Sequence, residues 1–192
     1  MGWTSYNARN YTKGRIDKKA ECLDVISEDY KVVKSVMVGN VFYGAVKKTR
    51  EPVIFNGEYV LDENDKKIYR MIENAPVFAV VILTSVDMKD YFNFSYKIMD
   101  ETVGPYYYDC PNSILKLLSP IKNEFATKWR SECKKRTTIK KELNKLPYGS
   151  KILVDGKEYK KEKYGKKTYW LNRAFCFIRP NDIIRIGYSV IA

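Results

Sequence analysis

The longest unbroken apolar run of the chain, Val77–Leu83, restricts the fold more than any other feature. It is rich in β-branched residues and follows Pro76, which together favour a strand over a helix. A strand without polar alternation is covered on both faces, so it belongs near the centre of a layered sheet. The run has seven residues and is far too short to cross a membrane.

The rest of the N-terminal part predicts an antiparallel sheet around this strand. Three further runs have strand character: Val32–Val38, Val41–Val46 and Tyr91–Ile98. Asp17 stands where it can cap a short helix that ends near Ser27. The segment 47–74 is charged and rich in turn residues, and we expect it to project as a loop. Residues 1–111 are therefore predicted to form an α+β domain.

Residues 112–146 are predicted to be helical. Asn112–Leu118 forms a short helix, and Ser119-Pro120 supplies the cap and the first-turn proline of a longer one. Four apolar side chains then recur at intervals of four residues and are expected to share one buried stripe: Ile121, Phe125, Trp129 and Cys133. The later turns of this long amphipathic helix are crowded with lysine and arginine.

Residues 147–192 are predicted to form short strands separated by turns. Asp155-Gly156 is a favoured type I′ hairpin dipeptide. The remaining runs predict strands, and they are Lys151–Val154, Lys157–Tyr159, Thr168–Leu171, Ala174–Arg179, Ile183–Ile186 and Tyr188–Ile191. We expect a small, basic, SH3-like β-barrel, so the whole chain has an α+β architecture.

The positive charge is concentrated in the second part of the chain. Of the 35 basic and 23 acidic residues, residues 1–111 hold 15 and 16, whereas residues 112–192 hold 20 and 7. This asymmetry points to a polyanionic partner, DNA or RNA. The alternative is a solvated surface that keeps the protein soluble.

Lysines interleaved with aromatic residues define the candidate binding residues. Lysine neutralises phosphates without reading sequence, and aromatic rings can stack on bases. For Trp170, which is flanked by Leu171, the sequence allows two roles: a ring that stacks on a base, or a residue of the core. The predicted nucleic-acid-binding residues are Lys134, Lys135, Arg136, Lys140, Lys141, Lys157, Lys160, Lys161, Lys163, Tyr164, Lys166, Lys167, Tyr169 and Arg173.

The absence of histidine removes most catalytic chemistry. Serine and cysteine triads, histidine bases and histidine-containing zinc sites are all excluded. Carboxylates at Asp100, Glu101 and Asp109, with Asp87 and Asp90 upstream, are an alternative magnesium site for a nuclease. A rigid connection between domains explains the same segment without chemistry. We therefore expect no enzyme, no catalytic residue, no metal site and no cofactor.

Cysteine usage and the lack of targeting signals favour the cytoplasm. The four cysteines, at positions 22, 110, 133 and 176, contain no CxxC pair and are expected to be reduced. No secretory signal is recognisable at the start of the sequence, and Tyr6 replaces the Ser or Thr of a myristoylation signal. We expect a cytoplasmic protein without a membrane partner.

Several blocks of sequence carry a family resemblance. They are Gly2–Tyr6, Ile16–Cys22, Val33–Gly39, Leu83–Ser85, Asp90–Lys97, Met99–Pro111 and Ser113–Pro120. Together they resemble an uncharacterised family, a domain of unknown function, of phages and conjugative elements in Gram-positive bacteria. The resemblance implies a mobile-element context and no catalytic residues. Relatives often carry histidine where this chain has Asn7–Tyr11, so histidine-dependent chemistry does not transfer.

Two classes of function follow from the sequence. The first is a non-enzymatic accessory protein of a phage or mobile element that holds nucleic acid through its basic C-terminal part, while the N-terminal domain contacts a host or mobile-element protein. The second is an anti-defence, anti-CRISPR-like inhibitor that binds a host nuclease or its RNA complex. The metal-dependent nuclease is the third and weakest reading.

Overall fold

The chain divides into two compact units, an N-terminal unit of residues 1–133 and a C-terminal unit of residues 134–192. The computed structural model describes the backbone of residues 4–8, 16–87 and 93–191, and the side chains of residues 16–86 and 94–191. The boundary falls inside helix α3 (Glu124–Lys145) rather than after residues 111 and 146, where the sequence placed it. One continuous helix therefore contributes residues to both units.

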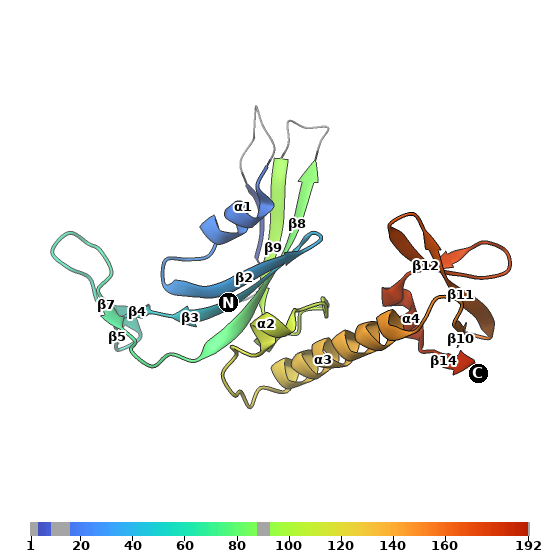
Figure 1. Ribbon diagram of the computed structural model, residues 1–192. Helices are drawn as coiled ribbons and strands as arrows, with labels where there is room; N and C mark the ends of the chain where they lie inside the picture. The colour runs from blue at the N-terminus through green and yellow to red at the C-terminus, as the bar shows by residue number, and fades with distance from the viewer. Residues whose placement is uncertain (1–3, 9–15, 88–92, 192) are drawn as a thin grey trace. The chain divides into compact units, whose positions relative to one another are not determined.

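The N-terminal unit is built on a five-stranded antiparallel sheet (Figure 1). Its strands are β1 (Thr4–Ala8), β2 (Tyr30–Val38), β3 (Val41–Lys48), β8 (Val77–Asp87) and β9 (Asn93–Asp100). They are ordered β1-β9-β8-β3-β2, so the apolar run lies in the central strand, as predicted. The strand predicted over residues 91–98 is β9, and residues 91 and 92 lie outside the described residues.

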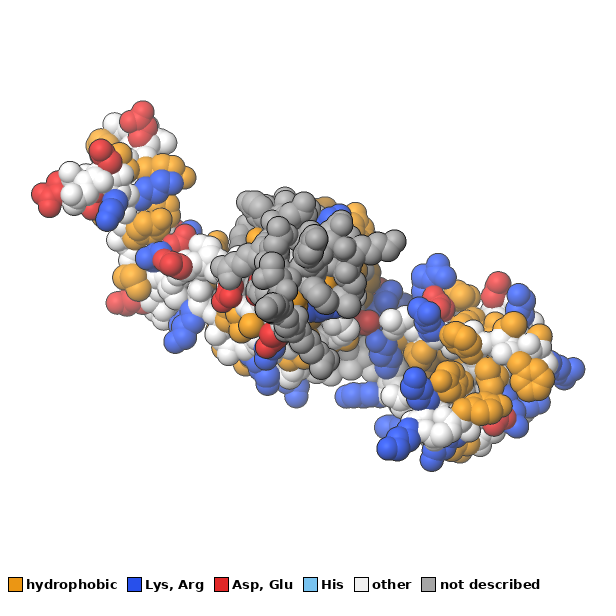
Figure 2. Space-filling view, turned by 90° about the horizontal axis from the view of Figure 1, so that it is seen from above, with side chains coloured by type: hydrophobic (Ala, Val, Ile, Leu, Met, Phe, Trp, Pro, Cys, Tyr) orange, Lys and Arg blue, Asp and Glu red, His pale blue; other side chains and the backbone are white. Residues whose placement is uncertain are grey.

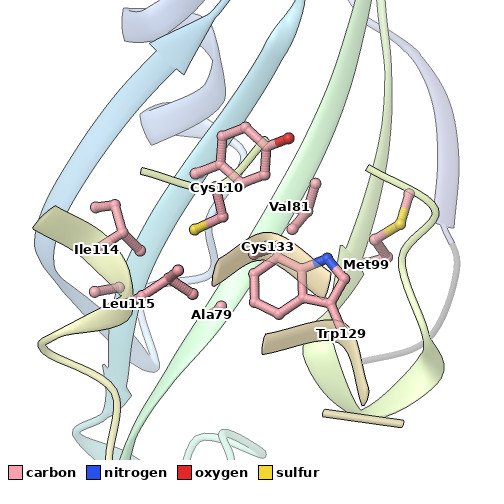
Figure 3. Close-up of a cluster of buried hydrophobic side chains, with 10 residues drawn as sticks. Ala79, Val81, Met99, Cys110, Ile114, Leu115, Trp129 and Cys133 are labelled. Atoms are coloured by element: carbon pink, nitrogen blue, oxygen red, sulfur yellow. The ribbon is translucent and has the colours of Figure 1, made fainter. Parts of the chain in front are cut away.

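The central strands β3 and β8 are buried on both faces. On one face, Ala79 and Val81 pack with Trp129 and Cys133 of α3 and with the short helix α2 (Asn112–Leu115), as Figure 3 shows. The opposite face carries Phe42, Val80 and Phe94, and it packs against Cys22 and Ile26, in and just after helix α1 (Lys18–Asp24). The predicted cap is confirmed, because the Asp17 carboxylate accepts from the Lys19 and Ala20 amides.

A narrow arm extends from the sheet between β3 and β8 (Figure 1). It consists of two short antiparallel pairs, β4 (Arg50–Pro52) with β7 (Tyr69–Met71) and β5 (Ile54–Phe55) with β6 (Glu58–Tyr59). Phe55 and Met71 are strongly exposed on this arm. The arm therefore presents apolar side chains that the chain itself leaves in contact with solvent.

Helix α3 begins later than the sequence suggested, and Phe125 was wrongly assigned to its buried stripe. Its N-terminal cap is Asn123, whose side-chain oxygen accepts from the Ala126 amide at 2.9 Å. The Ser119 hydroxyl instead accepts from the Val77 amide at 2.9 Å, which ties this loop to the central strand. Phe125 is 60% exposed, while Ala126 and Trp129 are buried. The stripe is shifted by one residue from the predicted one at this end.

The C-terminal unit contains a second antiparallel sheet of five strands. They are β10 (Lys151–Val154), β11 (Lys157–Tyr164), β12 (Lys167–Leu171), β13 (Phe177–Ile178) and β14 (Ser189–Ile191). Their order is β13-β12-β11-β10-β14, and no closed barrel is found in the described part of the chain. Asp155 and Gly156 both have positive φ, as the predicted type I′ turn requires.

One predicted strand of this unit is a helix. Residues 183–186 belong to helix α4 (Pro180–Ile186), although their isoleucines favour a strand. Pro180 at the first helical position and Asp182 in the first turn are helix-start features, and Ile183 becomes a core residue. The core of the unit combines Leu143 of α3 with Trp170 and Ile183. None of the described helices is long and apolar enough to span a membrane.

Candidate nucleic-acid interface

The excess positive charge of the protein coincides with the C-terminal unit. Residues 134–192 contain 16 basic and 5 acidic side chains, whereas residues 1–133 contain 19 and 18. The formal charge is therefore +11 on the smaller unit and +1 on the larger one. Figure 2 shows many lysine and arginine side chains over the C-terminal unit, interspersed with hydrophobic ones.

Helix α3 carries one exposed basic stripe. Lys134, Lys141 and Lys145 recur at helical intervals, and all three are exposed. This stripe lies on the side of the helix opposite Leu143, which is buried in the C-terminal core. The other predicted residues of the helix differ in accessibility: Lys135 is exposed, while Arg136 and Lys140 are half-buried.

The central part of the inner face of the C-terminal sheet is buried and is not available to a ligand. Tyr159 and Trp170 point into the core and are buried, which places Trp170 in its structural role. Because side chains alternate along a strand, Lys161 points the same way as Tyr159.

Lys161 is a helix cap and not a surface lysine, so its predicted role as a binding residue is wrong. It is 5% exposed, and its Nζ donates to the carbonyl oxygens of Leu143, Asn144 and Leu146 at 2.9, 2.8 and 2.6 Å. These are carbonyls at the C-terminal end of α3, where the helix itself supplies no further donors. The ammonium group is fully engaged and cannot contact a phosphate.

The outer face of the same sheet carries an exposed aromatic cluster. The rings of Tyr164 and Tyr169 meet edge to face with centroids 6.1 Å apart, and Tyr169 meets Phe177 in the same way at 6.3 Å. Tyr164 is 56% and Phe177 is 58% exposed. The antiparallel register explains the grouping, because side chains two residues apart on a strand share a face. Glu162, two residues before Tyr164, lies opposite Tyr169, and Leu171, two residues after Tyr169, lies opposite Phe177. The structure thus brings the predicted Tyr164 and Tyr169 together.

A shallow pocket of about 370 Å³ lies beside this cluster. Its lining combines aromatic, aliphatic and charged side chains, and the residues are Lys151, Glu158, Lys160, Glu162, Tyr164, Leu171, Asn172, Arg173 and Phe175. Lys160 is bound to Glu162 at 2.7 Å, and this hydrogen bond raises the pKa of Lys160. Lys151 is bound to Glu158 at 2.9 Å and lowers the pKa of that carboxylate. Both lysines of the pocket are therefore already paired.

The remaining predicted residues of the C-terminal unit differ in their distance from the aromatic cluster. Lys166 and Lys167 are exposed at the turn between β11 and β12, and Arg173 lines the pocket. Lys163 points to the inner side of the sheet but is exposed, with its Nζ 6.0 Å from the centroid of the Tyr148 ring. Lys157 is exposed at the opposite end of β11, roughly 23 Å from Tyr164 at the rise of a strand.

Two aromatic residues of the outer face were missed by the sequence analysis. The sequence predicts a strand over residues 174–179, which contains Phe175 and Phe177, and it names neither as a binding residue. In the structure β13 is confined to residues 177–178, and residues 172–176 form a turn that exposes Phe175. No signal in the sequence separates this outward placement from a core strand.

Two of the carboxylates considered for a metal site, Glu101 and Asp100, have structural roles. Glu101 is fully buried in the 3-10 helix η1 (Glu101–Val103), and it forms a bidentate ion pair with Arg130, whose Nε and Nη2 each lie 2.6 Å from one of its oxygens. The Asp100 carboxylate caps η1 by accepting from the Thr102 amide. Among the described residues, no group of three or more histidine, cysteine or acidic side chains is suited to hold a metal ion. Asp90 and the side chain of Asp87 lie outside the described residues.

The cysteines differ sharply in accessibility, which gives a simple expectation. Cys22, Cys110 and Cys133 are buried, and burial raises the pKa of Cys22 to about 12. Cys176 is exposed in the turn before β13, not packed in a strand as predicted. We expect a thiol reagent to label one cysteine in the folded protein and all four in denaturant. Mass spectrometry of the labelled peptides checks this, and rapid labelling of Cys110 in the native state would contradict the fold.

No protein-family model, curated protein or solved structure matches the chain. The resemblance to proteins of phages and conjugative elements therefore stays a prediction.

Proposed function

We propose that the protein is a non-enzymatic, cytoplasmic accessory protein of a phage or mobile element, and that it holds nucleic acid through its C-terminal unit. The observation that carries the proposal is the formal charge of +11 on residues 134–192, against +1 on the rest of the chain. A solvated surface of this size normally mixes the two signs more evenly, whereas a phosphate backbone is matched by a surface of one sign.

The proposal includes an SH3-like, partly open barrel for the C-terminal unit. Its support is the strand order, in which four strands form a meander and the fifth, β14, returns to pair with the first, β10. Helix α4 makes the return connection between β13 and β14. Such an arrangement presents the outer face of β11 and β12 to solvent and leaves the inner face for the core.

We propose that the protein has no enzymatic activity because two of the candidate carboxylates already have partners within the protein. Glu101 is committed to Arg130, and Asp100 is committed to the cap of η1. A hydrolytic metal site needs several carboxylates that converge on one ion with open positions for water and substrate. Cleavage of DNA or RNA in the presence of Mg²⁺ or Mn²⁺ that is lost in Asp109→Ala would overturn this part of the proposal.

Salt-dependent binding is the direct test. We expect fluorescence-labelled oligonucleotides to bind at low ionic strength, with a log–log slope of about −0.7 to −0.9 per phosphate contact. Reversal of Lys163, Lys166 and Lys167 to Glu should remove roughly two units of that slope. Fluorescence anisotropy over a salt titration measures both quantities.

The matched control changes the net charge by the same amount elsewhere. Lys19, Lys31 and Lys34 are exposed in the N-terminal unit, and their reversal to Glu should leave the salt slope unchanged. If the wild-type protein binds no DNA or RNA at low salt, or if both triple variants weaken binding equally, the C-terminal unit is not the binding site.

A second candidate, an anti-defence inhibitor that binds a host nuclease or its RNA complex, is favoured by the arm of residues 50–71. Several apolar side chains on it are exposed, Phe55 and Met71 most of all. Contiguous exposed apolar side chains commonly mark protein interaction sites. Retention of one nuclease-type protein from a lysate that has been cleared of nucleic acid, and its loss in Phe55→Ser with Met71→Ser, would favour this candidate.

A further inference from the structure

Four aromatic side chains gather at the outer face of the C-terminal sheet without being part of its core. Tyr164, Tyr169 and Phe177 form the edge-to-face cluster described above, and Phe175 stands in the turn that precedes Phe177. Phe175 and Tyr164 also line the same pocket. Aromatic side chains stabilise a core more than most others because they bury a large apolar area. A group of them on a face exposed to solvent is therefore typical of a binding site.

Phe175 is held outward by its turn at an energetic cost. Its φ is 58°, a left-handed conformation that bulky side chains rarely adopt. The turn is fixed by Asn172, whose side-chain oxygen accepts from the Ala174 and Cys176 amides at 3.0 and 2.9 Å. The Phe175 side chain is 80% exposed and gains little burial in return. A strained backbone that places an apolar ring in water is explained if the ring meets a ligand.

The charges around these rings select the chemistry of that ligand. Lys167 lies opposite Tyr164, Lys166 stands in the adjoining turn, and Arg173 lines the pocket with Tyr164; all three are exposed. The two carboxylates of the pocket, Glu158 and Glu162, are paired with Lys151 and Lys160. Protein interfaces are depleted in lysine at their cores, whereas aromatic rings beside lysine and arginine are the usual site for single-stranded nucleic acid. In a duplex the base faces are covered by their neighbours, so only unpaired bases can stack on these rings.

We propose that the outer face of β11–β13 is a stacking platform for single-stranded nucleic acid, on which Phe175, Tyr164 and Phe177 contact unpaired bases and Lys167 and Arg173 contact phosphates. This inference rests on the proposed function and narrows it to single strands. The stacking of bases on these rings also contributes a part of the binding free energy that does not depend on the salt concentration.

The decisive variant is Phe175→Gly. Glycine adopts positive φ at little cost, so the substitution should leave the unit at least as stable as the wild type while it removes the ring. We expect affinity for a single-stranded homopyrimidine 12-mer to fall about 10-fold with an unchanged salt slope. Lys167→Gln should instead reduce the slope by about 0.7. Phe55→Gly, which removes an exposed aromatic side chain from the arm, is the control and should bind as the wild type does.

The anisotropy titrations distinguish failure of the proposed function from failure of the stacking platform. Absence of salt-dependent binding in the wild type refutes the proposed function itself. Binding that is equally tight for the 12-mer and its duplex, and insensitive to Phe175→Gly and Tyr164→Leu, refutes the stacking platform while leaving the proposed function intact. Sedimentation that shows a dimer of the wild type and a monomer of Phe175→Gly would mean that a second copy of the chain covers this face, which also refutes the platform.

Discussion

Replacement of Arg130 by Met is expected to destabilise the N-terminal unit by about 3–5 kcal/mol. The variant leaves the Glu101 carboxylate fully buried without its bidentate partner. It also removes the bond from Arg130 Nη1 to the Ser119 carbonyl at 2.7 Å, which joins α3 to the loop before it. A buried carboxylate must then either take up a proton or draw water into the core. Urea denaturation followed by circular dichroism measures the loss.

Two comparisons separate the ion pair from general damage to the helix. Lys128→Met lies on the exposed side of α3 and should change the free energy of unfolding by no more than about 0.5 kcal/mol. Combining Glu101→Gln with Arg130→Met removes both charges and should recover part of the loss. An Arg130→Met protein as stable as the wild type would show that Glu101 does not depend on this pair.

The second large effect is expected from Lys161→Met in the C-terminal unit, about 2–3 kcal/mol. The substitution keeps an apolar side chain of similar length but removes the three hydrogen bonds to the end of α3. Hydrogen exchange of the backbone amides of residues 134–191 should detect the loss. Lys160→Met changes an exposed, ion-paired lysine on the neighbouring position and should cost less than about 1 kcal/mol.

The same pair of variants tests the reassignment of Lys161. If Lys161 is a cap, the folded Lys161→Met protein retains the salt slope of the wild type, because no phosphate contact is lost. A reduced slope together with unchanged stability would return Lys161 to the binding surface.

Local periodicity was enough to predict the N-terminal sheet. The apolar run at residues 77–83 predicts a strand that is buried on both faces, and the alternation in residues 91–98 predicts one that buries a single face. The Asp155-Gly156 turn was predictable for a similar reason, since few dipeptides accept two positive φ values. These features depend only on neighbours in the sequence.

The errors arise where distant contacts decide the outcome. Residues 183–186 have the β-branched composition of a strand, but Ile183 is held in a helix by packing against the C-terminal core. Phe125 was placed in the core by spacing alone, and one residue of phase moved it outside. The partners of Glu101 and Lys161 lie 29 and up to 18 residues away, a separation that no local pattern encodes.

For the candidate site, the sequence located the charge but not its arrangement. Counting basic residues identified the C-terminal part, and the structure narrows the excess to residues 134–192. The register of β11 against its neighbouring strands decides which lysines form ion pairs, which one caps helix α3 and which are exposed. The outward rings of Phe175 and Phe177 depend on the turn at Asn172, which forms through side-chain hydrogen bonds.

Helix α3 also determines how the protein can be divided. Trp129 and Cys133 complete the N-terminal core, whereas Leu143 completes the C-terminal one, and the backbone is helical throughout. Extending an existing helix costs far less than nucleating a new one, so each half of α3 is expected to stabilise the helical state of the other. A fragment that starts after Leu146 would leave Ile152 and Trp170 without their cover, and one that ends before Glu124 would open the N-terminal core. Neither sheet is expected to fold once it is cut away from this helix.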